Sequence, residues 1–194
     1  MLTDLPNLLT LARIAAIPLL VALAAIGTPV CDILACAVFG LAGITDYFDG
    51  KLAREREQTS DVGRMLDPIA DKLLVAATLM MLVGQQRLGP AGIYPAIVIM
   101  LREILVSGLR EYLAGLRVSL PVTKLAKWKT GFQMAALGTL LAGHTGATVI
   151  YLGFLPVVEI GALLLWTAAI LTIVTGWDYL RAGLRHAGVA GIGG

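Results

Sequence analysis

Four aspartates in one stretch of the chain have the chemistry and spacing to bind divalent metal ions. They form two pairs, Asp46 with Asp49 and Asp67 with Asp71, spaced three and four residues apart. On helices, each spacing places both carboxylates of a pair on one face. Carboxylate oxygens suit hard cations, and four like charges brought together would repel strongly unless cations neutralised them. The spacing therefore predicts a site for one or two divalent ions.

The residues between the two aspartate pairs suit a phosphate group. Gly50 has no side chain and Ala53 a small one, so a ligand can lie close to the helix there. Arg54 follows Gly50 by one turn, and its planar guanidinium matches phosphate oxygens. Ser60 could add a hydroxyl donor, and Gly63 opens the next helix, where backbone N–H groups can face an anion. These residues indicate a phosphate site beside the metal ions.

The elements that must position this site are apolar helices. Of the 194 residues, 58% are hydrophobic and only 14% are charged. In soluble domains about 45–50% of the residues are apolar and roughly 25% are charged. A bilayer span needs about 20 residues, and six apolar runs are long enough. We therefore expect an all-α integral membrane protein, a six-transmembrane-helix bundle that forms one domain over 1–187, with a flexible glycine-rich tail at 188–194. The expected helices are 8–27, 31–53, 64–86, 91–116, 128–148 and 153–182.

Basic residues predict the orientation of the bundle. Lys and Arg gather in segments 51–64 and 117–129 and near the C-terminus, whereas the opposite connections contain Arg87 alone. The positive-inside rule then places both termini and the aspartates on the cytoplasmic side of the cell (inner) membrane. A formal net charge of +2 is too small to indicate a nucleic-acid partner. Because no basic segment precedes the first apolar run, no cleavable signal peptide is expected.

The spacing of the acidic stretch resembles a family signature. Asp46-x2-Asp49-Gly50-x2-Ala53-Arg54-x8-Gly63-x3-Asp67-x3-Asp71 is similar at every position to the signature of the CDP-alcohol phosphotransferase family. Residues 6–13 resemble the opening of these enzymes. Segments 102–103, 110–111 and 126–134 look like the branch that makes phosphatidylglycerophosphate. The resemblance covers essentially the whole chain.

The resemblance implies an enzyme of phospholipid (phosphatidylglycerol) biosynthesis. Phosphatidyl transfer from CDP-diacylglycerol to sn-glycerol 3-phosphate would release CMP. Two divalent cations, Mg²⁺ or Mn²⁺, would be held mainly by Asp46, Asp49 and Asp67. Asp71 would be the general base for the acceptor hydroxyl and could also touch the second metal. The residues expected to hold the CDP moiety are Asn7, Thr10, Asp49, Gly50, Ala53, Arg54, Ser60 and Gly63.

The sequence leaves two roles open for the basic residues that could bind the acceptor. Glycerol 3-phosphate is an anion, so it needs cations, and Arg110, Lys127 and Lys129 are the candidates, ahead of Arg102 and Arg181. The alternative for these cations is to anchor helix ends at the membrane surface.

The first helix contributes three polar residues whose roles the sequence leaves open. Asn7 and Thr10 either close the CDP pocket or cap the helix. Arg13 could contact a phosphate or a lipid headgroup, and the sequence does not decide between them.

The sequence also allows three other functions, which must be distinguished from phosphatidyl transfer to glycerol 3-phosphate. An enzyme of the same family could use inositol phosphate, serine or phosphatidylglycerol as the acceptor. A cation channel or transporter could use the carboxylates as a transport site, but the glycine and arginine spacing has no evident role there. An inactive structural homologue would not need all four carboxylates. A homodimer is an expectation of the resemblance alone.

Overall fold

The computed structural model describes three stretches of backbone. These cover residues 5–56, 61–115 and 124–186, and side chains are not described for 5–6, 46–56, 61–62, 64 and 184–186. Within these stretches all six expected helices are present and no strand occurs. They are α1 (Leu5–Ile26), α2 (Pro29–Arg56), α3 (Asp61–Gly84), α4 (Gly89–Gly115), α5 (Lys124–Val149) and α6 (Val157–His186).

The helix ends follow the turn signals in the sequence. The largest disagreement with the expected ranges is four residues, for example at the start of α6, which begins at residue 157 and not at 153. Gly27 ends α1 with a φ of 68°, in the left-handed region that favours glycine, and Pro29 opens α2. Apolar runs and glycine or proline punctuation therefore predict the division of this chain correctly.

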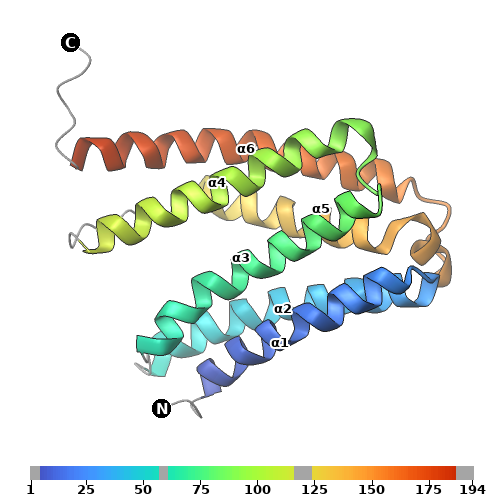
Figure 1. Cartoon of the computed structure of the whole chain (residues 1–194), viewed down its shortest axis with the longest axis horizontal. Helices are drawn as coiled ribbons and strands as arrows, with labels where there is room; N and C mark the ends of the chain where they lie inside the picture. The colour runs from blue at the N-terminus through green and yellow to red at the C-terminus, as the bar shows by residue number, and fades with distance from the viewer. Residues whose placement is uncertain (1–4, 57–60, 116–123, 187–194) are drawn as a thin grey trace.

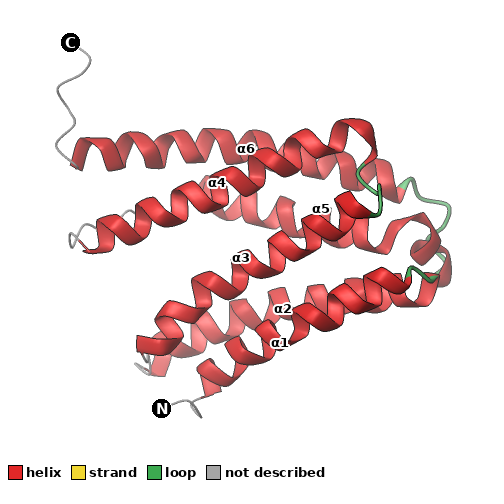
Figure 2. Cartoon of the chain, viewed as in Figure 1, coloured by secondary structure: helices red, strands yellow, loops and turns green. Residues whose placement is uncertain are grey.

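The helices form a bundle in which successive helices run back and forth. α1 packs against α2 and α3, α5 lies against both α2 and α6, and α4 packs against α6 (Figure 1). The start of α1, the end of α2, the start of α3 and the ends of α4 and α6 lie on the same side, at the left of Figure 1. The loops described between helices all lie at the opposite end (Figure 2). The two segments with the signature aspartates therefore meet at one end of the bundle.

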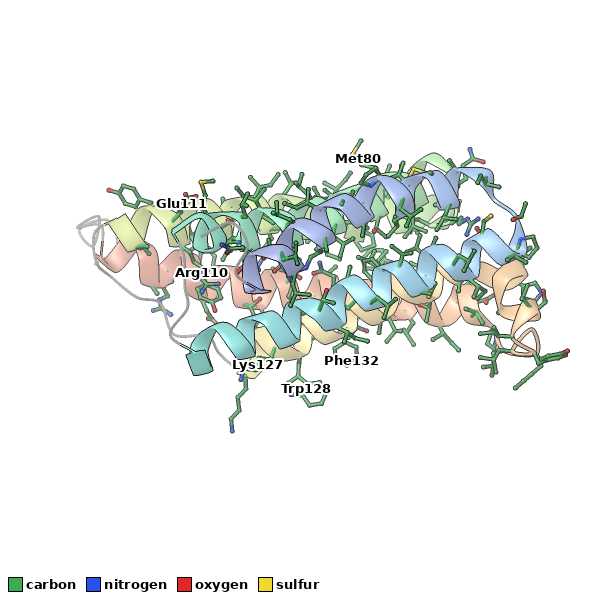
Figure 3. The ribbon with its side chains drawn as sticks, turned by 90° about the horizontal axis from the view of Figure 1, so that it is seen from below. Met80, Arg110, Glu111, Lys127, Trp128 and Phe132 are labelled. Atoms are coloured by element: carbon green, nitrogen blue, oxygen red, sulfur yellow. The ribbon has the colours of Figure 1, made fainter. Side chains whose placement is uncertain are left out.

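Three of the helices are long and apolar enough to cross a membrane. Among the described residues these are Asn7–Ile26, Gly89–Gly115 and Val157–Gly183, with mean hydropathies of 2.3, 1.6 and 2.2. α2 adds a shorter apolar stretch, Pro29–Thr45, before its polar end. Large apolar side chains also point outward, for example Met80, which is 74% exposed (Figure 3). Such a surface is typical of a protein that contacts lipid.

A buried ion pair ties three elements together at the end of the bundle remote from the aspartates. Asp32 of α2 is 1% exposed, and its Oδ1 accepts a 2.7 Å hydrogen bond from Nη2 of Arg87, in the connection between α3 and α4. Nη1 of Arg87 donates to the carbonyl of Leu141 at 2.7 Å, and Thr145 donates to Asp32 at 3.2 Å. Between them Gly143, with φ 59° and ψ −177°, interrupts the helical ladder of α5. Arg87 therefore bridges α2 and the break in α5.

Loss of this bridge is expected to destabilise the bundle. Arg87→Met leaves the Asp32 carboxylate buried without its cation, which should lower the free energy of unfolding by about 3–5 kcal/mol. Denaturant titration in detergent micelles measures the change. The double variant Asp32→Asn, Arg87→Met removes both charges and should recover most of the loss. Equal stability of Arg87→Met and the parent protein would show that the pair contributes nothing.

Candidate active site

The signature aspartates are divided between α2 and α3. The backbone of α2 is helical through Asp46 and Asp49, but their side chains lie outside the described residues, as do those of Ala53 and Arg54. Gly50 belongs to the same segment, and Ser60 lies in a stretch whose backbone is not described either. The contacts predicted for these residues stay predictions, and the described half of the site comes from α1 and α3.

Asp67 and Asp71 of α3 contact two buried residues of α1. Oγ1 of Thr10 donates to Oδ1 of Asp67, and Nη1 of Arg13 lies 2.8 Å from Oδ1 of Asp71. Thr10 and Arg13 are 1% and 2% exposed, whereas the Asp71 side chain is 49% exposed. Thr10 and Arg13, three residues apart on α1, thus contact Asp67 and Asp71, which are four residues apart on α3. One face of α1 therefore holds both carboxylates.

These contacts argue against helix capping by the polar residues of α1, while their contact with CDP stays a prediction. Thr10 lies beyond the first turn of a helix that begins at Leu5, so it cannot be an N-terminal cap. Asn7, one turn earlier, is 3% exposed and lies inside the same helix. Arg13 forms an ion pair with a carboxylate of the signature, which provides a partner for its buried charge. Asn7, Thr10 and Arg13 therefore form one polar stripe on α1.

The described carboxylates fit a site for hard divalent cations. Asp67 and Asp71 lie one turn apart, and both are partly exposed, so their oxygens are accessible. Carboxylate oxygens of this kind are the donors that Mg²⁺ and Mn²⁺ prefer. Among side chains that the structure describes, no group of three or more His, Cys, Asp or Glu gathers. Asp46 and Asp49 are the residues that would complete the donor set, and both lie outside that part of the chain.

The residues predicted to bind the acceptor lie on α4 and α5, and their side chains do not face one another. Lys127 is exposed, and Figure 3 shows it projecting away from the bundle beside Trp128. Lys129 is only 3% exposed, and its ammonium group donates to Oε1 of Glu103 in α4. Because residues two apart point to different sides of a helix, the two lysines do not face one ligand together. Arg110 lies exposed on α4.

The two cations ranked lower also lie apart. Nη2 of Arg102 donates to Oγ1 of Thr175 in α6 at 3.2 Å, and its guanidinium lies 5.7 Å from the centre of the Tyr179 ring. Arg181 is exposed on α6. Arg102 thus packs between helices, as a partly buried arginine with an aromatic partner commonly does.

Comparison with known proteins decides the family. Residues 3–174 match the family model described as CDP-alcohol phosphatidyltransferase. The chain belongs to the CDP-alcohol phosphatidyltransferase family. Its similarity to curated members of this family extends over nearly the whole chain, so the family predicted from the signature is confirmed.

Three relatives illustrate that similarity, and each is named CDP-diacylglycerol–glycerol-3-phosphate 3-phosphatidyltransferase. The protein of Rickettsia bellii is 47% identical over 179 residues, which cover 92% of this chain and 94% of the relative. That of Cereibacter sphaeroides is 39% identical, with 94% and 96% covered. That of Bacillus subtilis is 38% identical, with 91% and 93% covered. The similarity therefore extends over more than nine tenths of this phosphatidyltransferase and of each relative.

The contacts of Arg13 and Lys129 in this phosphatidyltransferase were not predicted from its sequence. The first is Arg13 with Asp71, for which an arginine inside an apolar run, three residues after Thr10, was the available signal. The second is Lys129 with Glu103, which joins residues 26 positions apart on different helices. The spacing of residues along one helix carries no information about that pair.

Proposed function

We propose that this phosphatidyltransferase transfers the phosphatidyl group of CDP-diacylglycerol to sn-glycerol 3-phosphate, giving phosphatidylglycerophosphate and CMP. The observation that carries the proposal is the 47% identity, over 92% of the chain, to a relative named for this reaction. The pairing of Asp67 and Asp71 with α1 supports it, because transfer requires carboxylates held in fixed positions. The full signature in the sequence argues against an inactive homologue.

The reaction exchanges one phosphorus–oxygen bond for another. A hydroxyl oxygen of glycerol 3-phosphate attacks the phosphorus that bears the diacylglycerol group, and the bond from that phosphorus to the CMP phosphate breaks. Asp71 accepts the proton of the hydroxyl, and CMP leaves with the electron pair of the broken bond. Arg13 keeps the Asp71 carboxylate oriented, and the exposed part of that carboxylate is open to the acceptor.

The remaining carboxylates are proposed to hold two divalent cations. Asp46, Asp49 and Asp67 would be the main ligands, and Asp71 would also contact the second ion. When bound, Mg²⁺ or Mn²⁺ neutralises the negative charge that develops on the attacking and leaving oxygens. Thr10 contributes by donating to Asp67, which fixes the rotamer of that side chain. The proposed CDP-binding set remains Asn7, Thr10, Asp49, Gly50, Ala53, Arg54, Ser60 and Gly63.

The membrane arrangement follows from the charge distribution. We infer six spans with both termini in the cytoplasm of the cell and the active site at the inner, cytoplasmic face of the membrane, because Lys and Arg gather at the end of the bundle with the signature. α2, α3 and α5 are less apolar than the other three because they carry the polar ends that form the site. This arrangement gives water-soluble glycerol 3-phosphate direct access from the cytoplasm while the acyl chains stay in the bilayer.

An acceptor panel tests the proposed reaction. Purified protein in mixed micelles receives CDP-diacylglycerol together with glycerol 3-phosphate, serine, inositol phosphate or phosphatidylglycerol, and the lipid product is identified by mass. Glycerol 3-phosphate alone is expected to give a new lipid with stoichiometric release of CMP. A lipid product with one of the other acceptors and none with glycerol 3-phosphate would contradict the proposal. Cation flux through vesicles without CMP would instead support a transporter.

A further inference from the structure

A second polar cluster lies inside the bundle, on α4, α5 and α6. Its centre is Glu103, whose Oε1 accepts from the ammonium group of Lys129 and whose Oε2 lies 3.8 Å from Nη1 of Arg102. Arg102 also bonds to Thr175 and lies over Tyr179, so it is fixed on the α6 side. The carboxylate therefore has one oxygen toward each cation, and two cations share one anion.

Contacts between α2 and α5 place Lys129 at the depth of the signature aspartates. Gly43 of α2 lies against Met134 of α5, and Gly146 of α5 lies against Asp32, so the two helices are antiparallel. With a rise of about 1.5 Å per residue, Lys129 lies about 7.5 Å from the level of Met134 toward the signature end. By the same rise, Asp46 and Asp49 lie about 4.5 Å and about 9 Å beyond Gly43 in that direction. Lys129 is thus level with the backbone between them.

The side of α5 that carries Lys129 also presents an amide whose oxygen lacks a partner. Gln133 lies one turn from Lys129 and is 2% exposed. Its Oε1 makes no hydrogen bond within the residues that the structure describes. A buried carbonyl oxygen without a donor is unfavourable, so a polar ligand with hydroxyl groups would satisfy it. The cluster of Lys129, Glu103 and Arg102 has one more positive charge than negative charges, and Gln133 adds an unsatisfied acceptor one turn from Lys129. Together they suit a phosphate that carries hydroxyl groups.

We propose that Glu103 is a positioning residue that holds the buried ammonium group of Lys129 toward the phosphate of the acceptor. The proposal rests on the proposed function, since it gives Lys129 a role in binding glycerol 3-phosphate. Glu103 acts through Lys129 and does not touch the acceptor. A buried lysine without a carboxylate partner would lose its proton or move to a solvated position, because an isolated buried cation is strongly disfavoured. Glu103 keeps Lys129 both charged and fixed at the level of the aspartates.

Substitution of Glu103 tests this role. Glu103→Gln keeps the shape of the side chain but removes its charge, and is expected to raise the KM for glycerol 3-phosphate about tenfold, with the KM for CDP-diacylglycerol within about twofold of the parent value. Glu111→Gln on the exposed face of α4 is the matched control and should change neither constant. Equal increases in both KM values, or no increase, would overturn the proposal.

A second pair of variants decides the question even if Glu103→Gln does not fold. Lys129→Met is compared with the double variant Glu103→Gln, Lys129→Met, in which both charges are absent. If Glu103 acts only through Lys129, the two proteins should have the same KM for glycerol 3-phosphate. A further rise in that KM in the double variant would refute the positioning role. If the parent protein itself makes no product from glycerol 3-phosphate, the proposed function fails, which is a separate outcome.

Discussion

Asp71→Asn is expected to lower kcat by about 10²–10⁴-fold, the usual contribution of a general base, while binding of CDP-diacylglycerol is largely retained. The asparagine oxygen can still accept from Arg13, so the α1–α3 contact should persist. An amide cannot take the proton of the acceptor hydroxyl. Turnover is measured as CMP release at saturating glycerol 3-phosphate, and binding as retention of radiolabelled CDP-diacylglycerol.

A neighbouring residue provides the control for this variant. Lys72 follows Asp71 on α3 and donates to the carbonyl of Pro68 at 2.6 Å, outside the contacts of the site. Lys72→Gln should therefore retain the kcat of the parent. If Asp71→Asn also turns over at the parental rate, Asp71 is not the base.

Removal of divalent metal ions is expected to abolish activity altogether. Two divalent cations among the four carboxylates would supply charge neutralisation that the described cations of α1 and α3 do not, because Arg13 is paired with Asp71 and Lys72 bonds to the carbonyl of Pro68. Dialysis against EDTA should reduce CMP release to the level without enzyme. Added Mg²⁺ or Mn²⁺ should restore it.

The metal content of the dialysed protein is the necessary control. Elemental analysis must show less than one ion per chain before the rate is taken as metal-free. Asp67→Asn should raise the concentration of Mn²⁺ needed for half-maximal activity, because it removes a proposed ligand. Full activity in protein proven free of metal would exclude the proposed role of the cations.

The sequence was sufficient to predict the helices and the family, for local reasons. Gly27, with its positive φ, and Pro29 mark the turn between the first two helices, and the spacing from Asp46 to Asp71 lies within two consecutive helices. Such signals need no knowledge of the tertiary structure. The acceptor, predicted from segments 102–103, 110–111 and 126–134, agrees with the names of relatives at 38–47% identity.

Contacts between helices that are far apart in the sequence could not be predicted from such local signals. The role of Arg13 depends on α3 being the neighbour of α1, and that of Lys129 on Glu103 of α4 lying within reach of its side chain. Periodicity shows which residues share a face, but it does not show which helix that face meets. Lys127 and Lys129 were predicted together because of their charge, although one is exposed and the other is buried.

Membrane topology was predicted in more detail than the structure supports. Three of the six helices meet the length and hydropathy of a span among the described residues, and α2, α3 and α5 are more polar. Polar residues that serve a site lower the hydropathy of the helices that carry them, so a hydropathy average underrates such helices. Six spans therefore remain a proposal, and the homodimer stays a prediction of the family resemblance.

Anomalous X-ray diffraction from crystals grown with Mn²⁺ tests most directly whether the carboxylates of α2 and α3 meet around metal ions. The account predicts two anomalous peaks between these helices, each about 2.0–2.5 Å from carboxylate oxygens, with Asp67 a ligand and Asp46 and Asp49 completing the set. Side chains of Asp46 and Asp49 that point away from Asp67, with no Mn²⁺ peak between the helices, would contradict it.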